Sequence, residues 1–283
     1  MSRDDLAQRL AALVGAQPLE WTPRAGGYST AERYTVMLDD GRRVFVKTAD
    51  AEHMAAWLRR EHEVYASLRG SFVPELIGFD HDGGQPLLVI EDLSDADWGQ
   101  RWTPQRVALV RAALDELHAA PAPPNTAAVR DTYAGWFGRW HTVAADPEPF
   151  LSLGVRSRAW LDERLPAIVE AAEAVPVDGD AVVHLDVRSD NLCTLDERAV
   201  LVDWNWVSFG APELDLACWA CSLALEGGPA PWELLPDGRG FAAFIAGIFA
   251  ATAGLPPPQT APTVREFQAR QLAVALDWLD REL

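Results

Sequence analysis

The most informative segment of this 283-residue chain reads Val182-Val183-His184-Leu185-Asp186-Val187-Arg188-Ser189-Asp190-Asn191-Leu192. An apolar run leads into a polar loop, and the chain then returns at once to apolar residues. Buried polar groups need hydrogen-bond partners, so we expect this loop to lie at an edge of the protein or in a cleft. Eleven residues after Asn191, just past another apolar run, the chain continues with Val202-Asp203-Trp204-Asn205.

Three side chains of these two segments carry oxygen ligands: Asp186, Asn191 and Asp203. The extended residues from 181 to 203 predict a hairpin that would bring the three side chains close together. Two carboxylates and an amide suit Mg²⁺ and do not suit zinc, which prefers nitrogen and sulfur ligands. The sequence therefore predicts a magnesium site in this part of the chain.

These motifs resemble those of a known enzyme family. His184-x-Asp186-x4-Asn191, followed by Asp203-Trp204-Asn205, is similar to the catalytic and metal-binding signature of the aminoglycoside phosphotransferases, relatives of the protein kinases. The stretch from Phe209 to Ala217 resembles that family's Gly-x-Pro-x-x-Asp-Leu-Ala motif, and the resemblance covers roughly residues 20–225. Two positions depart from the family pattern, because Leu185 replaces a usual Gly and Asn205 replaces an acid that often follows the metal-binding Asp.

The resemblance implies an α+β, bilobal protein-kinase-like fold and a transfer of phosphate from ATP, with GTP as the alternative donor, in the presence of Mg²⁺. Asp186 would be the catalytic base, and Asn191 and Asp203 would hold the metal. Arg188 would stabilise the charge of the transferred phosphoryl group. The alternative for Arg188 is a plain ion pair with Asp190 or a surface acid.

The lysine content of the chain points to a site at Lys47, independently of this resemblance. Of the 24 basic residues, 23 are Arg and one is Lys47, in the apolar strand pattern Arg43-Val44-Phe45-Val46-Lys47. Arginine carries a broad planar fork, whereas lysine carries a compact charge on a thin stem. We infer that Lys47 marks a site where the fork does not fit.

The family likeness gives Lys47 a role, which is to contact the α- and β-phosphates of the nucleotide. Its acidic partner would come from the helix that follows, where Glu61 and Glu63 are both candidates and the family pattern favours Glu61. Ser29, in a loop with Gly26 and Gly27, would also reach the phosphates. The adenine edge would pair with the backbone around Ile90 to Asp92.

The periodicity of apolar residues predicts a strand-rich first part and a helical second part. The first part has expected helices at 3–16 and 51–69, and expected strands near 19–23, 32–38, 43–48, 76–80 and 86–91. After Asp92, helices are expected at 103–119, 128–142, 155–174, 211–225, 237–253 and 262–282. We therefore expect a nucleotide-binding lobe at 1–92 and a catalytic and substrate-binding helical lobe at 93–283, with a cleft between the lobes.

Composition excludes several classes of protein. A net charge of −18 argues against a nucleic-acid partner, which would require clustered Lys and Arg. No run of apolar residues is long enough for a membrane span. The three cysteines do not form a disulfide framework, and Cys218-x-x-Cys221 lies on an expected helix without a second pair of metal ligands. We expect a cytoplasmic protein without a secretory signal, either a monomer or a homodimer.

The leading hypothesis is a kinase that phosphorylates a hydroxyl of a small, amine-bearing molecule, such as an aminoglycoside in antibiotic resistance. Residues 211–283 contain nine Asp or Glu and four Arg, an acidic balance that favours a cationic acceptor. The alternative is a metabolic kinase of the choline, homoserine, fructosamine or methylthioribose type, since fold alone does not set the substrate. A kinase-fold binding protein without activity is less expected, because Lys47, Asp186, Asn191 and Asp203 are all present.

Overall fold

The computed structural model describes residues 2–24, 31–81, 85–99, 101–258 and 261–283, which form two compact units. The first unit comprises Met1–Gly99, Ala108–Asn125 and Asp190–Asn205. The second comprises Gln100–Val107, Thr126–Ser189 and Trp206–Leu283. The domain boundary near residue 92 stays a prediction.

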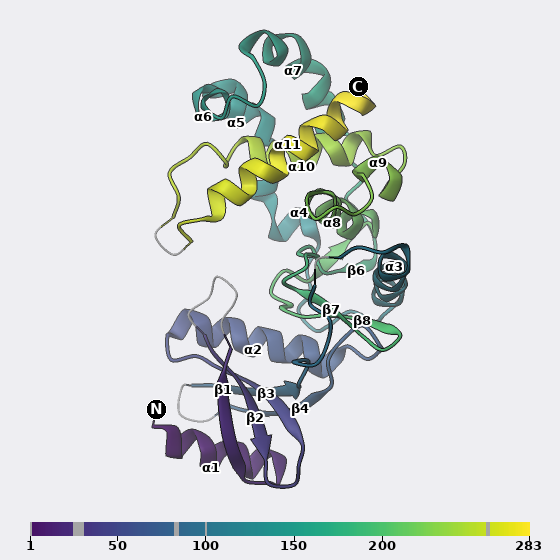
Figure 1. The fold of residues 1–283 in the computed structure, drawn as a ribbon. Helices are drawn as coiled ribbons and strands as arrows, with labels where there is room; N and C mark the ends of the chain where they lie inside the picture. Colours follow the sequence, from purple (N-terminus) through teal and green to yellow (C-terminus); the bar gives the residue numbers. More distant parts are fainter. Residues whose placement is uncertain (1, 25–30, 82–84, 100, 259–260) are drawn as a thin grey trace. The chain divides into compact units, whose positions relative to one another are not determined.

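An antiparallel sheet of five strands organises the first unit (Figure 1). Its spatial order is β1-β2-β3-β5-β4, and its strands are β1 (Pro18–Pro23), β2 (Glu32–Leu38), β3 (Arg43–Thr48), β4 (Leu76–Asp80) and β5 (Leu87–Glu91). The helices of this unit are α1 (Arg3–Val14), α2 (Glu52–Ser67) and most of α3 (Pro104–His118). Figure 1 shows α1 below the sheet and α2 above it. The strands and helices expected for this part of the chain are confirmed to within about two residues at most ends.

Strand alternation gives the sheet two different faces, because successive side chains point to opposite sides. On one face, Val44 and Val46 of β3 pack with Leu6 and Leu10 of α1 in an apolar core. On the other face, Phe45 and Lys47 of β3 line a pocket. Thr35 and Arg33, their cross-strand partners on β2, line it as well.

A short hairpin completes the first unit. It consists of β7 (Leu192–Leu195) and β8 (Arg198–Leu201), which pair with Leu192 opposite Leu201. Because Asn191 and Asp203 flank the hairpin, the pairing brings them to the same end, where the Val202 N–H donates to the Asn191 carbonyl at 2.9 Å. The structure thus has a hairpin between Asn191 and Asp203, whereas the residues before Asp186, Ala181–Val183, pair with Ser208–Gly210 and are not part of it.

The second unit is mainly helical. Its elements are α4 (Val129–Thr132), η2 (Ala134–Trp136), α5 (Arg139–Ala145), α6 (Glu148–Ser152), α7 (Arg158–Glu173), β6 (Ala181–Val183), β9 (Ser208–Gly210), α8 (Glu213–Leu225), α9 (Pro231–Leu234), α10 (Arg239–Ala250) and α11 (Val264–Glu282). The strands β6 and β9 pair antiparallel, β6 directly before the segment His184–Asn191 and β9 shortly before α8. The mixed α+β composition is therefore as expected.

One predicted helix differs from the structure. The range 128–142 is divided into α4, the 3₁₀ turn η2 and α5. Gly138 adopts a φ of 66° at the start of α5, a left-handed conformation that ends regular helical hydrogen bonding. The periodicity of apolar residues indicates which face of this segment is buried, but it does not indicate the break in the helix at Gly138.

None of the helices in the described part of the chain combines the length and apolar character needed to cross a bilayer.

Helix α1 provides a test of how the sheet is stabilised. Leu10 is fully buried, and replacing it with Ala removes apolar contacts and leaves a cavity, so Leu10→Ala should lower the free energy of unfolding by about 2–5 kcal/mol. The matched control is Gln8→Ala, an exposed site on the same helix, which should change stability by less than about 0.5 kcal/mol. Urea denaturation measures both, and equal effects of the two variants would show that α1 does not support the core.

Candidate active site

A pocket of about 410 Å³ lies within the first unit. It is bounded by the open face of the sheet, the helix α2, the segment after β5 and the ends of the β7–β8 hairpin. A cavity of this size with convergent polar groups is typical of a small-molecule site. Of the predicted site residues it is lined by Lys47, Glu61, Ile90, Asp92, Asn191 and Asp203.

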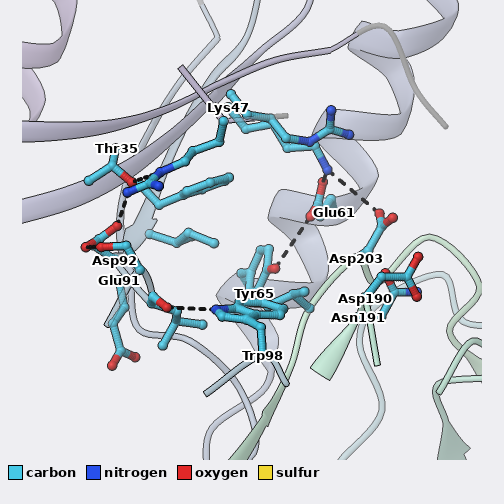
Figure 2. Close-up of a pocket in the computed structure, with 17 residues that line it drawn as sticks. Thr35, Lys47, Glu61, Tyr65, Glu91, Asp92, Trp98, Asp190, Asn191 and Asp203 are labelled. Carbon is cyan, nitrogen blue, oxygen red and sulfur yellow. Dashed lines mark hydrogen bonds and ion pairs between the residues drawn. The ribbon is translucent and has the colours of Figure 1, made fainter. Parts of the chain in front are cut away.

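Lys47 and Glu61 form the central ion pair of this pocket (Figure 2). The Nζ of Lys47 donates to Oε2 of Glu61 at 2.6 Å and lies 3.7 Å from Oδ1 of Asp203. The side chains of Lys47 and Glu61 are only 10% and 4% exposed. Glu63, the other candidate partner, instead pairs with Arg60 at 3.0 Å.

Burial shifts the pKa values of two side chains at this pair. It raises the pKa of the Glu61 carboxyl above its ordinary value of 4.5, and the Lys47 ammonium opposes that rise. The negative charge of Asp203 raises the pKa of Glu61 further. Burial also raises the pKa of the Tyr65 hydroxyl well above its usual range, so Tyr65 stays protonated beside Glu61.

The segment after β5 is held by the side chain of Asp92. Thr35 Oγ1 donates to Asp92 Oδ1 at 2.9 Å, and Ser94 Oγ donates to the other oxygen of the same carboxylate. Arg24 Nε donates to Thr35 Oγ1 at 2.9 Å, which extends this network to the end of β1 (Figure 2). Both oxygens of the Asp92 carboxylate are therefore engaged within the protein.

Asn191 and Asp203 line the pocket with their oxygen-bearing side chains. Asn205 donates from Nδ2 to Asp203, and its own buried Oδ1 has no hydrogen-bond partner in the described part of the chain. Within that part, no three His, Cys, Asp or Glu side chains gather as metal ligands. A carboxylate, an amide oxygen and an unsatisfied acceptor fit Mg²⁺, which commonly uses one or two protein carboxylates together with water and phosphate oxygens.

The remaining predicted catalytic residues, Asp186 and Arg188, belong to the second unit. Arg188 Nε lies 3.0 Å from Asp186 Oδ1, and Arg188 Nη2 donates to Oδ2 at 3.3 Å. Arg188 thus contacts both oxygens of Asp186, the predicted base, through one hydrogen bond and one ion-pair contact. Asp186 was not among the partners expected from the sequence, which were Asp190 or a surface acid.

Asp215 fixes the start of the same loop. Its buried carboxylate accepts the His184 N–H at 3.0 Å and the Leu185 N–H at 2.7 Å. Leu185 has a φ of 65°, a left-handed conformation that is unfavourable for a branched side chain. This explains why the related family usually has Gly at this position, and the two hydrogen bonds to Asp215 help to hold the strained turn.

Sequence reasoning missed several residues of the pocket. Thr35 and Phe45 could have been found from strand alternation, since Phe45 is two residues before Lys47 and must share its face. Trp98, whose Nε1 donates to the Leu93 carbonyl at 2.9 Å, follows no regular pattern in the sequence. Ser29, Gly26 and Gly27 lie outside the described residues.

Cys218 and Cys221 lie on α8, as expected, and burial raises the pKa of Cys221 to about 12.

The sequence and the fold both resemble those of known proteins. The sequence matches the family described as "Phosphotransferase enzyme family" over residues 20–267. A comparison with curated proteins gave no match.

Three solved structures illustrate the similarity of fold. A spectinomycin phosphotransferase, APH(9)-Ia, in complex with ADP and spectinomycin, has a TM-score of 0.62 and 12% identity, with 100% of this chain and 99% of that chain covered. A thermostable mutant of aminoglycoside phosphotransferase APH(4)-Ia has a TM-score of 0.57 and 15% identity, with coverage of 97% and 98%. A choline/ethanolamine kinase family protein from Mesorhizobium loti has a TM-score of 0.57 and 16% identity, with coverage of 100% and 98%. The predicted protein-kinase-like fold is confirmed.

The buried ion pair yields a prediction about stability. Lys47→Met leaves Glu61 buried without its cation, so we expect a loss of about 3–5 kcal/mol in the free energy of unfolding at pH 8. The double variant Lys47→Met/Glu61→Gln should recover much of this loss, because it removes the uncompensated charge.

The loss of stability in Lys47→Met should become larger as the pH rises. The folded-state pKa of Glu61 is raised above 4.5, so the penalty for its charge is absent below about pH 4.5 and grows as the pH rises. Urea denaturation of variant and wild type from pH 4 to 8 measures the difference. A difference that stays constant across this range would mean that the charge of Glu61 is not its source.

Proposed function

Because the chain belongs to the phosphotransferase enzyme family, we propose that it is an ATP- and Mg²⁺-dependent O-phosphotransferase acting on a small, hydroxylated, amine-bearing molecule. The observation that carries the proposal is the pocket in which the chain's one lysine, Lys47, pairs with Glu61 beside Asp203. GTP is the alternative phosphate donor.

The first unit would bind the nucleotide. Lys47 contacts the α- and β-phosphates, and Glu61 holds its ammonium in place. The backbone between Ile90 and Asp92 pairs with the edge of the base, supported by the hydrogen bonds that fix Asp92. Ser29 would be a further contact to the phosphates.

Asn191 and Asp203 would hold Mg²⁺, which when bound neutralises charge on the phosphate oxygens. Asn205 supports this role of Asp203, because its amide orients the carboxylate. The acid that often occupies position 205 in relatives is thus replaced by a positioning group.

The second unit would supply the proton chemistry. Asp186 accepts or orients the proton of the acceptor hydroxyl, and Arg188 keeps the Asp186 carboxylate in one orientation. The guanidinium of Arg188 also places a positive charge beside the reacting groups, where charge develops during transfer.

Two features favour an amine-bearing acceptor. Residues 211–283 carry nine Asp or Glu and four Arg. In addition, Tyr133, Trp136 and Trp206 form a partly exposed cluster in the second unit, with Tyr133 and Trp136 stacked at 4.6 Å between ring centroids. Aromatic faces attract cations. A metabolic kinase for an amino alcohol or amino sugar is the second candidate for the same reasons.

An acceptor screen tests the proposed function. ADP release is measured with Mg·ATP and, in turn, aminoglycosides, choline, amino sugars and matched hydroxyl compounds without an amine. We expect acceptor-dependent release with at least one amine-bearing compound and a phosphorylated product detected by mass spectrometry. Release that depends only on neutral acceptors would overturn the substrate class, and no release with any acceptor would point to a binding protein.

The role of Asp186 can be tested separately. Asp186→Asn keeps the shape of the side chain and removes the base, so we expect phosphoryl transfer to fall by about 10²–10⁴-fold while ATP affinity is retained. Asp178→Asn, at an exposed carboxylate of the same unit, is the control and should be as active as the wild type. Turnover of the Asp186 variant at the wild-type rate would remove this residue from the mechanism.

A further inference from the structure

Glu226 makes two side-chain hydrogen bonds that the proposed chemistry does not account for. It lies at the C-cap of α8 and is half-buried. Its Oε1 accepts the hydroxyl of Ser189 at 2.5 Å, and its Oε2 accepts the indole N–H of Trp102 at 2.8 Å. A carboxylate at a helix C-terminus is disfavoured by the negative end of the helix dipole. The two hydrogen bonds offset this unfavourable placement.

Ser189 links Glu226 to the loop that carries the proposed base. It follows Arg188 in the loop and is only 7% exposed. At the other end of α8, Asp215 accepts the backbone N–H groups of His184 and Leu185. The helix therefore holds the loop at two places, through a residue of its first turn and through its C-cap.

Asp186 lies between the two attachment points in the sequence, because Asp215 contacts His184 and Leu185 whereas Glu226 contacts Ser189.

Trp102 keeps the Glu226 carboxylate in place. Its ring meets that of Trp219, on α8, edge to face at 5.3 Å between centroids. The guanidinium of Arg106 lies over the same ring at 4.9 Å. A ring fixed on both sides directs its N–H at Oε2, which leaves Oε1 free to accept the hydroxyl of Ser189.

We propose that Glu226 is a positioning residue for phosphoryl transfer, which acts through Ser189 to hold the loop that carries Asp186 and Arg188. This inference rests on the proposed function for its catalytic consequence and on the observed contacts for its structural one. Glu226 itself needs no contact with the reacting atoms.

Hydrogen–deuterium exchange tests the structural consequence without any substrate. Ser189→Ala removes the hydroxyl, and Glu226→Gln replaces the charge-assisted hydrogen bond between Ser189 and the carboxylate with a weaker bond between neutral groups. Both variants should speed exchange of the backbone amides at 186–190 by about tenfold or more, as expected for loss of a charge-assisted hydrogen bond. The control is Ser222→Ala. Ser222 is also buried but lies on α8, where its hydroxyl donates to the Trp219 carbonyl, so this variant should not change the exchange rates of the loop amides.

Kinetics test the catalytic consequence. ADP release is followed with Mg·ATP and water as the acceptor, so no acceptor needs to be known. Ser189→Ala and Glu226→Gln should each lower kcat by about tenfold and change KM for ATP by less than about twofold, because the nucleotide pocket is untouched. The double variant should be no slower than the slower single variant, as expected for two groups acting through one bond.

The outcomes separate the two proposals. Unchanged loop exchange in both Ser189→Ala and Glu226→Gln overturns the positioning role of Glu226, whatever the kinetics. Additive losses in the double variant, or a change confined to KM, overturn it as well. A wild-type protein that releases no ADP with any acceptor contradicts the proposed function, and in that case the exchange experiment still decides whether Glu226 holds the loop.

Discussion

The structure of the first unit depends on the burial of one cation. A lysine at the end of an apolar strand is tolerated only if a counter-charge reaches it, and Glu61 of α2 does so at 2.6 Å. This contact joins α2 to β3 at the edge of the pocket that Lys47 and Glu61 line. It also explains the single lysine of the chain, because a compact ammonium can lie between Glu61 and Asp203 where a guanidinium would need more room.

The loop at residues 184–189 in the second unit also depends on paired polar groups. Polar groups there are placed by partners that are themselves fixed: Asp215 holds the turn at Leu185, and Arg188 holds Asp186. The left-handed φ of 65° at Leu185 shows that this loop conformation is maintained against a local preference. Strain maintained in this way is common where side-chain orientation matters for chemistry, and it agrees with the role we propose for Asp186.

Much of the fold could be predicted from sequence because the signals were local. The lysine count and the apolar pattern of residues 43–47 singled out Lys47, and the extended residues from 181 to 203 predicted a hairpin, which the structure has between Asn191 and Asp203. The pairing of Glu226 with Ser189 connects residues 37 positions apart and leaves no periodic signal, so it required the structure. The break at Gly138 was missed for a related reason, since apolar periodicity reports which face is buried and does not report backbone conformation.

The central claim is that the pocket around Lys47 binds a nucleotide together with a metal. Calorimetric titration of ATP into the wild-type protein, first with Mg²⁺ and then with a chelator, tests it most directly. We expect saturable binding of one nucleotide per chain, with affinity that falls when Mg²⁺ is removed. Absence of binding in the presence of Mg²⁺ would contradict a nucleotide site in this pocket.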